Sequence, residues 1–355
     1  MEYFVAIASA GLAVATLRQK KAHDRVKDEQ KEHEVSKRLD SFFKGYGLSA
    51  LGKAAAEAWV KKAFDAKSNP HLERVRRWLV ATLNGKRTSP PSRWQRGCPE
   101  IIPGLRARAS WPADEFPWMK EFMASFDDIR SELLALRGVG SQSFQPYRAP
   151  TWANERRASD GVGSIAHDAG NWNVLYLQLH NADLDRIAEN RDRCPRTMRA
   201  LEIIGKRLYG HTFFSALAPN THITSHHGPT NKKLRVHIPL VVPPAATMGR
   251  CRIRVGEETL VAEEGKPYIF DDSLLHEAWN DSADAVRIVL IFDVWHPDLS
   301  DQEVKFLAFL RKAKLRKEKI LCSQATGGDD FYSILKSAAQ IDAKDADLWS
   351  GTLPS

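Results

Sequence analysis

The apolar and polar residues of the chain follow a helical pattern in its first part and a strand pattern after about residue 171. In residues 50–64 and 72–83, apolar side chains recur at a spacing of roughly 3.6, which predicts two helices. A further helix is predicted between Pro117 and Gly138, because large apolar residues recur there every three or four positions with charged residues between them.

Short apolar runs, several with period-two alternation, fill the later part of the chain, as is typical of β-strands. Turn residues such as Gly256 and Asn280-Asp281 separate these runs. The pattern predicts an α+β fold: a double-stranded β-helix (jelly roll) with flanking helices and an N-terminal helical region. Ser300 and Asp301 then predict the cap of a further helix. The expected strands cover residues 174–179, 213–217, 236–242, 252–255, 259–262, 268–270 and 288–294.

The chain starts with an apolar run at residues 3–17, which only Ser9 and Thr16 interrupt and which basic residues follow. The run predicts a single-pass anchor or signal-anchor. Because a full membrane span needs about 20 residues, this shorter run would cross as a tilted or thin span. A cleaved signal peptide is disfavoured because Glu2, and no Lys or Arg, precedes the run. A buried helix of a soluble domain is the alternative. The orientation, in the endoplasmic reticulum or on the cytoplasmic face, stays open because residues 18–40 mix both charges.

These patterns divide the chain into four expected segments. We expect an anchor at 1–17, a charged stalk and helical region at 18–110, a jelly-roll domain with flanking helices at 111–320 and a tail at 321–355. Residues 88–117 are dense in Pro, Gly and Arg, which predicts an irregular connection that lies over the next domain.

Composition narrows the possible partners of the chain. A hydrophobic content of 43% over 355 residues is enough to build a core. The formal charge of +8 permits an acidic partner, but the basic residues are interleaved with acids, so no nucleic-acid partner is expected. No CxxC pair indicates zinc or a redox loop. Cys194 and Cys251 could form a disulfide in an oxidising lumen, but buried free thiols are favoured.

Two histidines, His226 and His276, are the candidate metal ligands. Neutral imidazoles bind Fe(II), and these residues, although far apart in sequence, could meet across the mouth of a barrel. His226 is expected at the end of a loop, and His276 after the strand at 268–270. Iron sites on such barrels usually add an Asp or Glu two residues after the first histidine, but Gly228 stands there and offers no ligand atom.

Arg287 is the candidate anion-binding residue. It lies in the apolar run 285–290, where a buried guanidinium is costly unless an anion pairs with it. A keto-diacid would suit, because its distal carboxylate needs one charge partner while its keto-acid end chelates a metal. A structural salt bridge is the alternative. Arg235 and His237 are two residues apart, so a strand would project both from one face.

Three motifs surround the candidate ligands: His226–Asn231, Leu234–His237 and Phe270–His276. From about residue 171 to 299 the sequence resembles the aspartyl/asparaginyl β-hydroxylase family. In that family the carboxylate position is likewise a glycine and two histidines hold iron, so Gly228 agrees with the resemblance. The resemblance implies a dioxygenase that uses Fe(II), 2-oxoglutarate and O2 and hydroxylates a carbon of a second substrate while 2-oxoglutarate becomes succinate.

The resemblance also implies roles for individual residues. His226 and His276 would hold the iron and form the catalytic centre. Ser215 and Arg287 would hold the distal carboxylate of 2-oxoglutarate. The other cosubstrate-binding residues would be Arg235 and His237 near the metal-chelating end, and Trp172, for which a place in the core is the alternative.

The resemblance leaves more than one kind of second substrate open. Asp or Asn side chains of a protein are favoured, because the helical region before the jelly roll could build a peptide groove. The acyl chain of a membrane lipid is the alternative, and an N-terminal membrane anchor suits either. A jelly-roll binding module without turnover is a third hypothesis, which the presence of all the family's ligand and clamp residues disfavours.

Overall fold

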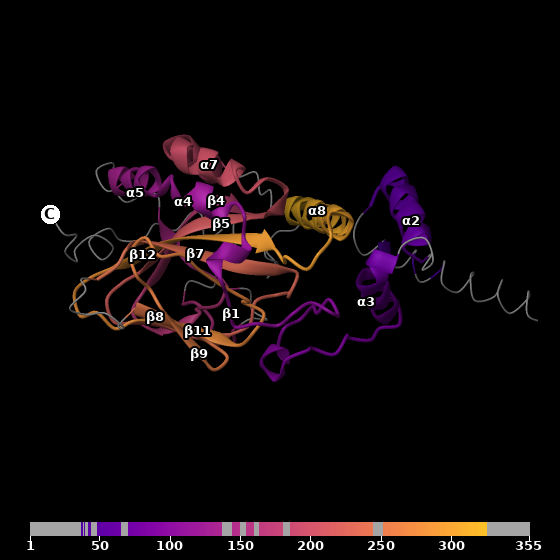
Figure 1. Ribbon diagram of the computed structural model, residues 1–355, viewed down its shortest axis with the longest axis horizontal. Coiled ribbons are helices and arrows are strands. Elements are labelled where there is room, and N and C mark those ends of the chain that lie inside the picture. The colour runs from indigo at the N-terminus through magenta and orange to yellow at the C-terminus, as the bar shows by residue number, and fades with distance from the viewer. Residues whose placement is uncertain are drawn as a thin grey trace, which may run out of the picture.

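Two antiparallel β-sheets face each other and form the centre of the molecule (Figure 1). The larger sheet has seven strands and the smaller has five within the part of the chain that the structure describes. The two-sheet architecture confirms the expected α+β jelly roll. The computed structural model describes residues 37, 39, 42–43, 48–64, 70–136, 144–149, 154–159, 163–179, 185–243 and 251–324.

The order of the strands brings together segments that lie far apart in the sequence. All strand pairs are antiparallel. In the larger sheet the order is β1 (Ser110–Trp111), β10 (Tyr268–Phe270), β7 (Lys233–Val241), β12 (Arg287–Trp295), β5 (Leu208–Leu217), β4 (Trp172–Leu179) and β2 (Gln145–Pro146). In the smaller sheet it is β3 (His167–Ala169), β6 (Thr221–His226), β11 (His276–Asn280), β8 (Cys251–Val255) and β9 (Glu258–Val261).

Alternation along the strands of the larger sheet separates two apolar layers. Phe214 and Leu290 point outward, where helices cover them, whereas Phe213 and Ile291 point toward the smaller sheet. The covering helices are α4 (Met119–Met123), α5 (Phe126–Ala135) and α7 (Pro195–Glu202), on the outer side of the sheet in Figure 1. Helix α6 (Asp185–Arg193) instead places Ile187 in the inner layer.

The single helix expected between Pro117 and Gly138 is two helices, so that prediction was wrong in its continuity. The chain leaves the helical path at Ala124 and Ser125 between α4 and α5. Asp127 and Asp128 lie in the first turn of α5, where negative charge favours a helix N-terminus, so the sequence supports a restart there.

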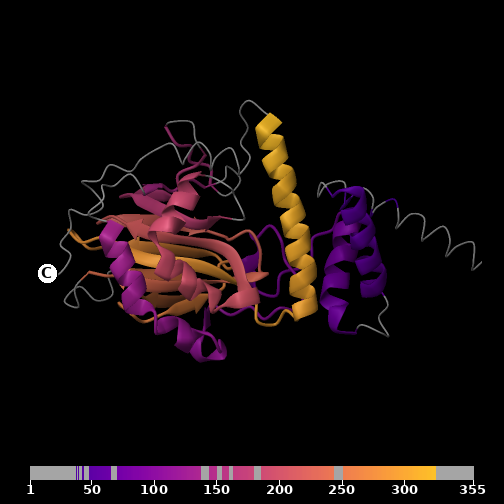
Figure 2. The same cartoon turned by 90° about the horizontal axis from the view of Figure 1, so that it is seen from above.

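A third apolar layer joins both ends of the described chain. Helix α8 (Asp301–Gln324) lies between the barrel and the helices α2 (Ala50–Phe64) and α3 (Glu73–Leu83), as Figures 1 and 2 show. The Trp59 ring stacks on Phe306 of α8 with centroids 4.3 Å apart. Shorter helical turns connect the elements: η1 (Pro70–Leu72), η2 (Arg93–Gln95), η3 (Ala113–Glu115) and η5 (Gly205–Arg207).

The expected cap before α8 is present. The amide of Glu303 donates to Ser300 Oγ (3.3 Å), and the Glu303 carboxylate accepts from the amide of Ser300 (2.8 Å), which is a reciprocal capping box. Cys98, Cys194 and Cys251 are buried free thiols, as the sequence favoured. Burial raises the pKa of Cys194 to about 12 and that of Cys251 to about 11, so neither is a thiolate at neutral pH.

The expected anchor at 1–17 lies outside the described residues, as do residues 18–36 and 325–355. Among the helices that the structure describes, none combines the length and the apolar character needed to cross a membrane. The proposed boundaries at residues 110 and 320 stay predictions; α8 continues past the second one to Gln324.

Phe306→Ala should lower the free energy of unfolding by about 3–5 kcal/mol, because it leaves a cavity between α8 and the N-terminal helices. Chemical denaturation measures the change. Leu51→Ala on α2 is the control: that side chain is 83% exposed, so the expected change is within about 0.5 kcal/mol. Equal stabilities for the Phe306 variant and the unmodified protein would show that this layer does not stabilise the fold.

Candidate metal and cosubstrate site

The structure brings His226 and His276 together through strand pairing. His226 ends β6 and His276 begins β11, and these neighbouring strands place the two residues opposite each other. Their ring centroids are 4.1 Å apart. The expectation that His226 ends a loop was wrong, because a ladder of backbone hydrogen bonds between the two strands fixes both residues.

Both imidazoles are oriented in the same way. The Nδ1–H of His226 donates to the carbonyl of Thr224, and that of His276 to the carbonyl of Leu274, each at 2.8 Å. A carbonyl can only accept, so the lone pair of each ring lies on Nε2. Burial lowers the pKa of both rings, that of His276 further with the help of His226, so both are neutral at pH 7. Two converging neutral nitrogens fit a divalent transition metal.

Gly228, two residues beyond the end of β6 at His226, offers no side chain that could be a third metal ligand. The amide of Gly228 donates to the Asp272 backbone carbonyl at 2.6 Å. A Cβ atom at residue 228 would lie only 2.5 Å from Asp272 Oδ2, so the Asp272 carboxylate fills the space that a side chain would need. The other oxygen, Oδ1, is buried without a hydrogen-bond partner. Such an acceptor fits a hydrated cation, and no cluster of three ligating side chains occurs in the described residues.

Arg287 carries a buried positive charge for which the described residues provide no carboxylate partner. It lies on β12 opposite Leu217, and Ser215 is its diagonal neighbour on the same face of β5. The residue is 1% exposed, its Nε has no hydrogen-bond partner, and no ion pair to it occurs among the described side chains. The alternative of a structural salt bridge is therefore not seen within those residues. A buried guanidinium in this state fits an anion.

Tyr268, which the sequence analysis did not single out, connects Arg287 with His237. Its hydroxyl lies 2.8 Å from His237 Nδ1 and also hydrogen-bonds the guanidinium of Arg287. Burial raises the pKa of Tyr268 to about 12, so the phenol is neutral. His237 Nε2 is buried without a partner, which leaves a second polar atom for a ligand on this face. The sequence predicted a strand at 268–270, but only the pairing of β10 with β7 places Tyr268 opposite His237.

Trp172 belongs to the core and also orients Ser215. Its ring is buried in the inner apolar layer, stacked on Tyr147 with centroids 3.6 Å apart. Its indole N–H donates to Ser215 Oγ at 3.0 Å. The hydroxyl hydrogen of Ser215 can therefore point away from the indole, toward a ligand beside Arg287.

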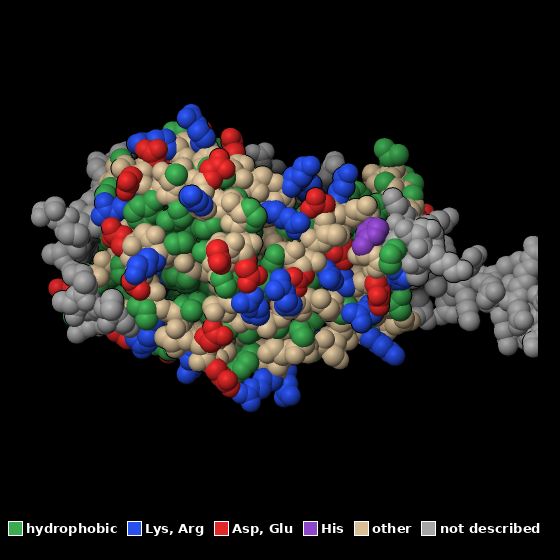
Figure 3. Space-filling model, in the orientation of Figure 1, with side chains coloured by type: hydrophobic (Ala, Val, Ile, Leu, Met, Phe, Trp, Pro, Cys, Tyr) green, Lys and Arg blue, Asp and Glu red, His purple; other side chains and the backbone are tan. Residues whose placement is uncertain are grey.

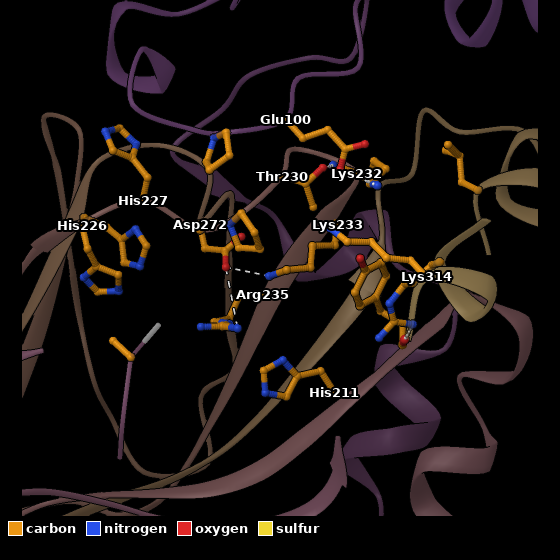
Figure 4. A pocket seen from close by; sticks show the side chains of 18 of the residues that line it. Glu100, His211, His226, His227, Thr230, Lys232, Lys233, Arg235, Asp272 and Lys314 are labelled. Atoms are coloured by element: carbon orange, nitrogen blue, oxygen red, sulfur yellow. Dashed lines mark hydrogen bonds and ion pairs between the residues drawn. The ribbon is translucent and has the colours of Figure 1, made fainter. Parts of the chain in front are cut away.

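Arg235 is already paired with a protein carboxylate. Its Nε and Nη2 bind the two oxygens of Asp293 at 2.9 and 3.1 Å. Lys233 Nζ bridges Asp272 at 2.6 Å and Asp293 at 2.9 Å, so two cations and two anions form one group. Figure 4 shows the contacts of Asp272 with Lys233 and Arg235. Burial alone would raise the pKa of Asp293, but Arg235 and Lys233 lower it below its ordinary value. The role of Arg235 in holding 2-oxoglutarate stays a prediction.

A cavity of about 600 Å³ connects this site with helix α8. Figure 4 shows His226 and His227 toward one end, Arg235 and Asp272 in the middle, and Lys314 of α8 toward the other end. The far part of the cavity has an apolar lining with cationic groups beside it. Its residues include Trp78 of α3 and, from α8, Leu307, Leu310, Arg311, Lys314 and Leu315.

Two neighbouring histidines, and an arginine without a carboxylate partner among the described residues, define a jelly-roll domain that can bind a metal ion and a small anion. Residues 123–297 match the sequence profile of aspartyl/asparaginyl β-hydroxylases. The chain is 32% identical over 229 residues to the human aspartyl/asparaginyl β-hydroxylase and 36% identical over 148 residues to human aspartate β-hydroxylase domain-containing protein 2. Residues 123–297, just under half of the chain, are therefore an aspartyl/asparaginyl β-hydroxylase domain.

These relatives are longer proteins. The matches cover 63% and 40% of this chain but only 27% and 38% of the two human proteins. The ornithine lipid ester-linked acyl 2-hydroxylase of Rhizobium tropici is 32% identical over 186 residues, which is 51% of this chain and 58% of that protein. A solved 2OG-Fe(II) oxygenase family oxidoreductase from Burkholderia pseudomallei aligns over 56% of this chain and 99% of its own, with 12% identity and a TM-score of 0.32.

Gly228→Ala should weaken metal binding by about tenfold or more, because the new methyl group would displace the Asp272 carboxylate or the loop that follows His226. Titration of the metal-free protein with Co(II) measures the affinity. Gly52→Ala on α2 is the matched control, since its Cβ would come no closer than 3.3 Å to another atom. Equal Co(II) affinities for the Gly228 variant and the unmodified protein would contradict this account of the site.

Proposed function

We propose that this protein is an Fe(II)- and 2-oxoglutarate-dependent dioxygenase. The observation that carries the proposal is the pairing of His226 with His276 on one sheet, together with the buried Arg287 on the other, which has no carboxylate partner among the described side chains. His226 and His276 would hold the iron through Nε2. Arg287 and the Ser215 hydroxyl would hold the distal carboxylate of 2-oxoglutarate, and the family membership of residues 123–297 supports these assignments.

The bound iron, when present, supplies the activation of O2; the protein supplies position and charge. The balanced reaction is substrate C–H plus 2-oxoglutarate plus O2, giving substrate C–OH, succinate and CO2. Thr224 and Leu274 keep both imidazoles in the ligating tautomer through their carbonyls. Tyr268 hydrogen-bonds the guanidinium of Arg287 from one side, which would leave its remaining N–H groups for the cosubstrate.

Arg287→Met should raise the KM for 2-oxoglutarate by at least about tenfold, because the distal carboxylate loses its charge partner. Arg287→Lys should recover part of the loss, since it restores the charge without the two-pronged geometry. Succinate formed without a second substrate is the readout. Arg252→Met, on a strand of the smaller sheet where Arg252 pairs with Asp281, is the control and should leave the KM unchanged. A protein that binds neither metal nor 2-oxoglutarate and forms no succinate would instead be a non-enzymatic binding module.

For the second substrate we propose Asp or Asn side chains of a protein, the substrate that the names of the human relatives indicate for those proteins. One observation favours a lipid acyl chain as the second candidate. The far part of the cavity has an apolar lining from α3 and α8, and an acylated lipid is the substrate that the name of the Rhizobium relative gives. Mass spectrometry of peptides and lipids from cells with and without the protein, read for an added oxygen, distinguishes the two.

Leu315→Glu tests the lipid candidate directly. The half-buried Leu315 lines the far part of the cavity, so a carboxylate there should reduce hydroxylation of an acyl chain by about tenfold or more. Succinate formation without a second substrate should not change, because the histidines and Arg287 are untouched. Leu51→Glu on α2, at an exposed position, is the control. Retained lipid hydroxylation in the Leu315 variant would show that the acyl chain does not lie along α8.

A further inference from the structure

A segment before the matched domain lies against the loop that follows His226 and the turn that precedes His276. Residues 94–102, which we call the strap, follow α3 in the chain and precede the family match at 123–297. In Figure 1 this part of the chain runs from α3 along the lower side of the molecule toward β1. It has little regular structure of its own, but hydrogen bonds attach it to the barrel at two places.

The first attachment is to the turn at residues 271–275, directly before His276. The amide of Leu275, the residue before His276, donates to the Trp94 carbonyl at 2.7 Å. The Gln95 side chain is 1% exposed, and its Nε2 donates to Asp271 Oδ2 (3.1 Å) and to Ser273 Oγ (2.7 Å). The strap therefore holds the turn whose Leu274 carbonyl fixes the His276 tautomer.

The second attachment is to the loop that follows His226. The amide of Glu100 donates to the Pro229 carbonyl (3.2 Å), and the amide of Asn231 donates to the Glu100 carbonyl (3.3 Å). The buried Asn231 side chain accepts from the Ile102 amide (2.7 Å) and donates to the Ile102 carbonyl (3.0 Å). Asn231 thus binds the strap as a neighbouring strand would.

Between the two attachments, the strap packs on His227. A Cβ atom at Gly97 would overlap the His227 ring, so only glycine allows this close approach. His227 in turn donates from Nδ1 to the Ser273 carbonyl at 2.9 Å. This hydrogen bond joins the loop that follows His226 to the turn that precedes His276. Strap, His227 and Ser273 therefore form one layer on the outer side of the site.

We propose that the strap positions the metal-binding histidines, with Gln95 and Gly97 as positioning residues that touch neither the metal nor a substrate. The proposal rests on the proposed metal-binding role of His226 and His276. The direction of a histidine lone pair depends on the carbonyl that holds its other nitrogen, so a loosened turn at 271–275 misdirects His276 Nε2. Residues 84–93 connect α3 to the strap, so the helical region and the metal site are joined through this segment of the chain.

Gln95→Leu in the full-length protein tests this. The substitution keeps the volume but removes both donated hydrogen bonds, so Co(II) affinity should fall by about 10- to 100-fold and the visible spectrum of bound Co(II) should change. Hydrogen exchange should accelerate at the Leu275 amide, with no comparable change in the centre of the larger sheet. Arg96→Leu is the matched control, because Arg96 is an exposed strap residue, and it should leave the affinity, spectrum and exchange unchanged.

Gly97→Ala is the second variant, for the case that the Gln95 variant does not fold. It should also weaken Co(II) binding, by pushing on His227. A folded Gln95 or Gly97 variant with the affinity and spectrum of the unmodified protein would overturn the positioning role. His226→Ala separates this outcome from failure of the proposed function. If this variant binds Co(II) as the unmodified protein does, the proposed metal site is wrong. If it loses Co(II) binding while the Gln95 and Gly97 variants keep it, only the positioning role of the strap is wrong.

Discussion

The pairing of β6 with β11 is the constraint on which the candidate site depends. The two histidines are fifty positions apart in the chain, and only the register of these strands sets them opposite each other. A shift of one residue in either strand would turn one imidazole to the other face of the sheet. The hydrogen bonds from Nδ1 to carbonyls two residues earlier are local to each strand end, so once the register is set, the orientation of both rings follows.

The buried cations around the site differ in whether a protein carboxylate neutralises them. Arg235, Lys233, Asp272 and Asp293 cancel one another in formal charge within the protein, whereas Arg287 has no such partner among the described side chains. The surface drawn in Figure 3 shows cations and anions interspersed in the same way. Of these buried cations, Arg287 is therefore the one whose charge the described carboxylates leave available to an entering anion.

Sequence periodicity predicted the parts of the fold that are buried on one continuous face. Helices α2 and α3 and the strands β4, β5, β7 and β12 carry long apolar patterns, so their positions follow from spacing alone. The smaller sheet was harder, because β6 and β11 carry polar residues such as His222 and Glu277 on their outer face and the apolar alternation is weak there. Strand β6 was missed for that reason, and His226 was placed in a loop.

The candidate ligands could be recognised from residue types and the resemblance, but their partners could not. Arg235 pairs with Asp293 because β7 and β12 are neighbours and place the two residues directly opposite, and no local pattern reveals which strands adjoin. The same holds for Gln95, whose contacts lie 176 and 178 residues away in the chain. Irregular segments such as the strap have no periodicity, so their contacts appear only in three dimensions.

The place of α8 sets the order in which the molecule can be completed during synthesis. Helices α2 and α3 emerge from the ribosome before the barrel, yet the ring that stacks on Trp59 belongs to α8, which emerges after it. Until then the Trp59 ring lacks its stacking partner Phe306, although other residues of this layer, such as Ile102 and Trp295, have already been made. The helical region is thus fully enclosed only at a late stage, and a nascent chain halted before residue 301 would leave Trp59 without this partner.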